Sequence, residues 1–268
     1  MKRSGIIRYP AFIEVSYRKF LLSLVSDINK DVRFSIMDNS YFKSSYNLFV
    51  KQDDTLEDIE KLIDNLKVKF LSGFLMTNLV LTKKSIEISN FNLRSITNAL
   101  PSYFSKSVKV ITQKLKELMR LWVIENSRLI KSINSKFLDD VAISVYEAVK
   151  TGLSVSSLAR NIERNYQVTK ARAKLIAVDQ VAKLNGALTR QRKLDLGLTD
   201  YVWVTSNDER VRKSHKVLEG KVCNFNNNAI FKDSVDDKTW DKRVSIGGDL
   251  NHPGFAIRCR CTSYSIYD

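Results

Sequence analysis

Apolar residues recur every three or four positions through much of the first 200 residues. After Asp54 or Thr55, either of which can cap a helix, the apolar positions form one stripe: Leu56, Ile59, Leu62, Ile63, Leu66 and Phe70. This period places side chains on one face of an α-helix. Similar patterns predict helices over 14–29, 95–103, 107–126 and 137–150. We therefore expect a mostly α-helical N-terminal region over residues 1–150.

The pattern beyond Gly152 predicts two more helices. Ser154 can cap the first, and Thr169 can cap a longer second helix that runs to about Leu196. Gly197 follows, and glycine is the usual residue just past a helix C-terminus.

Alternating apolar residues predict strands in the remainder of the chain. Tyr201 to Thr205 alternates as a short strand does, and the run from Phe255 to Tyr267 has a similar pattern. Turns separate the two runs. The expected fold is thus a mostly α N-terminal region followed by an α+β C-terminal domain, residues 151–268.

Composition predicts a folded protein with affinity for polyanions. The longest apolar stretch, 70–81, is shorter than the roughly 20 residues that span a bilayer, and no secretion signal stands at the N-terminus. We expect no membrane association and synthesis in the cytoplasm. The net charge of +15 is shared by both halves, which favours non-specific, salt-sensitive binding to nucleic acid. The alternative is a basic surface that only keeps the protein soluble.

Residues able to bind a metal gather in the last part of the chain. Every histidine and cysteine lies at or after position 215: His215, Cys223, His252, Cys259 and Cys261. His215, His252, Cys259 and Cys261 would satisfy Zn²⁺, with Cys223 in reserve. Their spacing matches no common zinc module, and buried reduced thiols are the alternative. No other cofactor is indicated.

The segment around His215 predicts a helix of about ten residues. Ser206 and Glu209 have the spacing of a capping box, and Gly220 would end the helix. One face would then carry Asp208, Arg212, His215 and Glu219. This face is either a solvated surface or a catalytic one. A nuclease would use His215 with Asp208, and a cysteine nucleophile, Cys261, could be drawn with the same two residues.

An ordered set of residues in this half resembles a known family. The set comprises Trp203, Asp208, Arg210, Arg212, His215, Gly220, Cys259, Arg260 and Cys261, with His252-Pro253-Gly254 between its two parts. It is similar to the C-terminal domain of phage Mu protein F-like minor head proteins, which function in head morphogenesis. The resemblance covers about residues 150–266.

The resemblance implies a minor capsid protein without enzymatic activity, in the head interior or at the portal vertex of the virion. It also implies that the portal protein, capsid or scaffold proteins and DNA are partners. The alternative is a metal-dependent or metal-free nuclease, or a toxin-like effector, built on the His, Cys, Asp and Arg residues of the C-terminal half.

Overall fold

The computed structural model describes residues 2–38, 56–72 and 74–267. The chain forms two compact units: the first consists of Met1–Glu14, Thr82–Val123 and Val178–Asp268, and the second of Val15–Leu81 and Ile124–Ala177. Four long helices contribute residues to both units: α1 (Ala11–Val32), α4 (Phe74–Ala99), α6 (Gln113–Thr151) and α7 (Val155–Asp195). The domain boundary at residue 150 stays a prediction.

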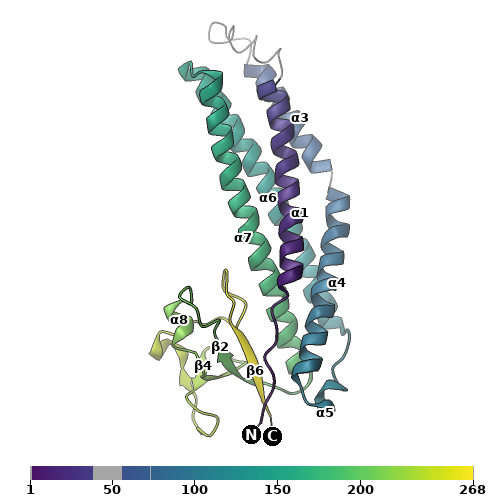
Figure 1. Cartoon of the computed structure of the whole chain (residues 1–268), viewed down its shortest axis with the longest axis vertical. Helices are drawn as coiled ribbons and strands as arrows, with labels where there is room; N and C mark the ends of the chain where they lie inside the picture. The colour runs from purple at the N-terminus through teal and green to yellow at the C-terminus, as the bar shows by residue number, and fades with distance from the viewer. Residues whose placement is uncertain (1, 39–55, 73, 268) are drawn as a thin grey trace. The chain divides into compact units, whose positions relative to one another are not determined.

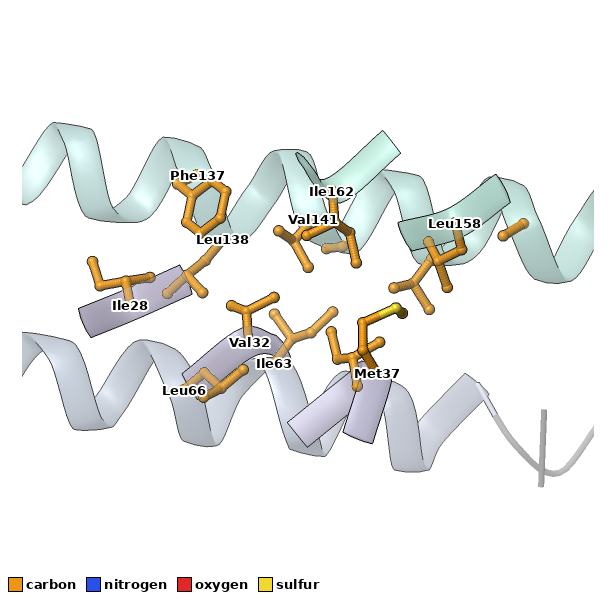
Figure 2. Close-up of a cluster of buried hydrophobic side chains, with 14 residues drawn as sticks. Ile28, Val32, Met37, Ile63, Leu66, Phe137, Leu138, Val141, Leu158 and Ile162 are labelled. Carbon is orange, nitrogen blue, oxygen red and sulfur yellow. The ribbon is translucent and has the colours of Figure 1, made fainter. Parts of the chain in front are cut away.

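The second unit is helical and is built around an apolar cluster. Segments of α1, α3 (Leu56–Ser72), α6 and α7 run side by side in it (Figure 1). Figure 2 shows their side chains meeting, among them Val32, Ile63, Phe137 and Ile162. A π-helical segment, Arg33–Asp38, extends α1 into the cluster.

The predicted stripe on α3 is confirmed where its side chains are described. Ile63 and Leu66 are buried in the cluster, and Leu62 and Phe70 pack against it. The proposed caps, Asp54 and Thr55, and the side chains of Leu56 and Ile59 lie outside the described residues.

The first unit contains an antiparallel sheet of six strands among the described residues. The strands are β1 (Lys2–Arg3), β2 (Asp200–Val204), β3 (Val222–Asn224), β4 (Ile230–Lys232), β5 (Asp241–Lys242) and β6 (Thr262–Tyr267). Their order is β1-β6-β2-β3-β4-β5. Trp203 of β2 lies opposite Ser263 of β6, and Figure 1 shows these two strands side by side. The mostly helical N-terminal region and the α+β C-terminal part are confirmed.

Two predicted helix breaks are wrong. The expected helices 107–126 and 137–150 join in one helix, α6, because no glycine or proline interrupts residues 113–151. The first of them begins at Gln113 rather than at residue 107. The predicted cap at Thr169 lies inside α7, where its hydroxyl donates to the Asn165 carbonyl at 2.8 Å, one turn back.

The predicted ends of α7 are confirmed. The Ser154 hydroxyl accepts from the Ser157 amide at 3.2 Å, as a cap does. At the other end Gly197 has φ 75°, and the Leu198 amide donates to the Lys193 carbonyl at 2.9 Å. The predicted helix 95–103 corresponds to the end of α4, followed by the short α5 (Ser102–Ser105). None of the described helices is long and apolar enough to span a membrane.

Candidate functional site

His215 lies on a short helix rather than on the predicted ten-residue one. Helix α8 covers only Lys213–Lys216 (Figure 1), and Asn207 has a left-handed φ of 54°. The predicted capping box is therefore wrong. The Asp208 carboxylate accepts from the Arg210 amide at 3.0 Å, a local bond that competes with helix formation. The result is a turn that leads into α8, in which His215 is buried, with 2% of the residue exposed.

Cys259 and Cys261 lie just before the last strand. Strand β6 begins at Thr262, and Arg258 has a φ of 56°, so the predicted strand does not extend back to residue 255. The predicted alternation nevertheless holds. Both cysteines are buried, whereas Arg258 and Arg260 are exposed.

The two cysteines and His215 form one buried cluster. The Nδ1 atom of His215 is 3.3 Å from Cys261 Sγ and 3.7 Å from Cys259 Sγ, and the three ligand atoms lie within 4.8 Å of one another. Nε2 of His215 is 3.3 Å from Asp249 Oδ2. The Trp203 ring meets the His215 ring edge-on, with 5.4 Å between centroids.

Charges within this cluster are coupled. The hydrogen bond with Cys259 raises the pKa of His215 above its usual value, and Asp249 acts in the same direction. The pKa of Cys259 is lowered, chiefly because Cys261 hydrogen-bonds to its sulfur. The cluster therefore favours one negative sulfur next to an imidazole.

The other two residues with metal-binding side chains lie elsewhere. His252 Nδ1 is 3.1 Å from the Tyr201 hydroxyl, and burial lowers the pKa of His252 to about 4. Cys223 lies on β3, and burial raises its pKa to about 11. Of the four residues predicted as a zinc set, the structure brings together His215, Cys259 and Cys261 but not His252.

Asp208 contacts arginine rather than His215. Arg260 Nη2 donates to Asp208 Oδ1 at 2.7 Å, and Arg210 Nη2 is 3.6 Å from Asp208 Oδ2. The carboxylate that contacts His215 is Asp249, so the structure does not join the two residues of the nuclease hypothesis. Arg212 donates to the Ile257 carbonyl.

Comparison with known proteins identifies this part of the chain. Residues 139–264 match the family described as "Phage Mu protein F like protein". This part of the chain is phage Mu protein F-like. All nine residues of the predicted motif, from Trp203 to Cys261, lie within the matched segment.

A relative with a similar sequence is an "Uncharacterized protein" of Haemophilus influenzae, 33% identical over 177 residues. The alignment covers 66% of this Mu F-like chain and 35% of the relative, so the chain spans about a third of that relative's length. No solved structure matches.

The sequence did not reveal two residues, Arg243 and Asp249, that hold the His215 cluster in place. Arg243 is fully buried, and its guanidinium donates to the carbonyls of Ile230, Asp249 and Asn251 and to the Tyr201 hydroxyl. It thereby fixes the loop that carries Asp249. The Asp249 amide also donates to the Ser214 carbonyl at 3.1 Å, which ties this loop to α8. The Gly247-Gly248 turn before Asp249 signalled a loop, but nothing in the spacing signalled its partner.

A cavity of about 320 Å³ adjoins the cluster. Cys259 and Cys261 line it together with Arg8, Thr205 and Arg260, among others. The two cysteines thus lie between His215 and this cavity, while Trp203 and the Asp249 loop cover other sides of His215.

Proposed function

We propose that this protein is a minor capsid protein of a tailed bacteriophage that associates with the portal vertex and contacts packaged DNA without sequence specificity. The observation that carries the proposal is the Mu F-like match over residues 139–264. A head-morphogenesis family fits a virion location. We propose in addition that the protein binds the portal protein, that it contacts DNA and that it catalyses no reaction.

A basic segment of the first unit supports the DNA contact. Between residues 106 and 120 the chain carries one acidic residue, Glu117, and five exposed basic residues. The basic residues are Lys106, Lys109, Lys114, Lys116 and Arg120. An exposed excess of positive charge attracts the phosphate backbone through counterion release, whatever the base sequence.

The assembly part of the proposal is tested on particles. Quantitative mass spectrometry of purified procapsids and virions measures this protein against the portal and the major capsid protein. We expect a low copy number that follows the portal protein across preparations. Absence from both particles contradicts the assembly proposal, and a copy number that follows the major capsid protein contradicts the portal location.

The DNA part is tested by the salt dependence of duplex binding, measured by fluorescence anisotropy. The variant Lys109→Glu, Lys114→Glu, Lys116→Glu is compared with a control of equal charge change at exposed sites elsewhere, Lys19→Glu, Lys150→Glu, Lys238→Glu. The slope of log K against log salt is negative, and each phosphate contact removed reduces its magnitude by about 0.9. We expect the segment variant to lose about 2 to 3 in slope and the control distinctly less. Equal losses contradict a role for this segment.

The nuclease alternative has its own experiment. Contact of His215 with a carboxylate, Asp249, is the observation that favours it. Wild type and His215→Ala are incubated with DNA and RNA in the presence of divalent metals. Cleavage by wild type that is lost in the variant supports an enzyme, whereas intact nucleic acid in both samples supports the structural role.

A further inference from the structure

We propose that His215, Cys259 and Cys261 bind a zinc ion, with the fourth coordination position open to the adjoining cavity. This inference is independent of the proposed function. It depends on the position of the three ligand atoms, on the partner that orients His215 and on the surroundings of the sulfurs.

The distances within the cluster are those of a shared metal. Zn–S bonds of about 2.3 Å and Zn–N bonds of about 2.0–2.1 Å, at tetrahedral angles, place sulfur and nitrogen about 3.6 Å apart. The two observed separations, 3.3 Å for Cys261 and 3.7 Å for Cys259, lie on either side of this value. Three side chains from two separate segments thus surround one point.

Asp249 determines which nitrogen of His215 is available. A carboxylate only accepts hydrogen bonds, so Nε2 of His215, 3.3 Å from Asp249 Oδ2, carries the proton. In the neutral ring Nδ1 then presents its single lone pair to both sulfurs. One lone pair accepts a hydrogen bond from at most one sulfur, whereas a metal ion between the three atoms is bound by all of them. A carboxylate that orients a histidine in this way is a frequent feature of zinc sites.

The sulfurs lie in surroundings that suit thiolate ligands. The Gly254 amide donates to Cys259 Sγ at 3.3 Å, and hydrogen bonds from backbone amides stabilise a negative sulfur. The described residues supply three ligands. Because the cavity of about 320 Å³ borders both cysteines, a water molecule can complete the tetrahedron, as in zinc sites that keep one open position.

Metal binding is tested on the full chain purified under reducing conditions without chelator. We expect about one zinc per chain by elemental analysis. After replacement with Co²⁺ we expect the visible and near-ultraviolet absorption of tetrahedral cobalt with thiolate ligands. Cys259→Ser and Cys261→Ser are each expected to lose most of the zinc and this absorption, whereas the matched control Cys223→Ser, a buried cysteine outside the cluster, is expected to keep both.

The wild-type measurement can refute the zinc site by itself, even if a cysteine variant does not fold. Folded, reduced wild type that contains no stoichiometric zinc and gives no thiolate–cobalt absorption overturns it. Equal metal content in wild type and in both folded cluster variants also overturns it, because the metal would then be bound elsewhere.

Discussion

Lys193 carries an amine that is buried without a carboxylate partner among the described residues. Its side chain has no exposure, and its ammonium donates to the Ser263 carbonyl at 3.2 Å and to the Ser263 hydroxyl at 3.1 Å. It lies 5.6 Å from the centre of the Phe225 ring. Within the ranges that the structure describes, no carboxylate forms an ion pair with it, and burial lowers its pKa from 10.5 to about 7. The charged amine is therefore disfavoured in the folded state.

The sign of the pH dependence follows from this shift. Between pH 7 and 10.5 the unfolded chain holds a proton on Lys193 that the folded chain has lost, so stability rises with pH across this window. From pH 7.5 to 9.5 the gain is about 2.5 kcal/mol, given 1.36 kcal/mol for each pKa unit. Lys193→Met removes the titrating group and abolishes this gain. The loss of its two hydrogen bonds adds a nearly pH-independent offset.

The measurement is urea unfolding followed by tryptophan fluorescence at several values from pH 6 to pH 10. The wild-type curve minus the Lys193→Met curve isolates the contribution of this residue. Lys216→Met, which removes an exposed lysine, is the matched control and should keep the wild-type pH dependence. If wild type and Lys193→Met rise in parallel between pH 7.5 and 9.5, the amine is not desolvated as the structure indicates.

Three further substitutions test the packing and the loops. Arg243→Met deprives the Tyr201 hydroxyl and three carbonyls of a buried donor, and should lower the free energy of unfolding by about 3–5 kcal/mol in urea titrations. His252 has a folded pKa of about 4 against 6.5, so wild type should lose up to about 3 kcal/mol relative to His252→Gln as pH falls from 6.5 to 4; parallel curves would contradict burial of the ring. Phe137→Ala empties a site in the helical core and should cost about 3–5 kcal/mol, with thermal melting as a second readout.

The sequence predicted the elements that local rules determine. The stripe on α3, the cap at Ser154, the end of α7 at Gly197 and strand β2 all depend on residues within a few positions of one another. The break in α6 was predicted between residues 126 and 137, where no glycine or proline interrupts the helix. The break in α7 was predicted wrongly because a threonine such as Thr169 can either cap a helix or bond one turn back within it. Only the neighbouring helices decide between these two states.

The sequence predicted which residue types form the site, but not which carboxylate contacts His215. The gathering of histidine and cysteine after position 215 indicated a common site, and three of the residues do meet. The partner of His215 was expected to be Asp208 on the same helix, but is Asp249, 34 positions away. Helical spacing could not reveal it, because the helix is replaced by a turn and the Asp249 loop is held by Arg243, whose side chain also bonds to Ile230 and Tyr201 in other strands.

The Cys-Arg-Cys run of the Mu F-like motif places two different interactions on one stretch of backbone. Cys259 and Cys261 face His215, while Arg260 between them faces outward and contacts Asp208 in the turn before α8. The segment 259–261 and the segment 208–215 are thus in contact at two places, once in the core and once at the surface. An exposed ion pair contributes little to stability alone, but here it engages the residue between the two cysteines. Asp208→Asn should therefore loosen the approach of the sulfurs to His215 while leaving the core packed, and this would be measured as weaker Co²⁺ binding at unchanged unfolding free energy. Unchanged cobalt affinity would show that the surface contact has no part in positioning the cysteines.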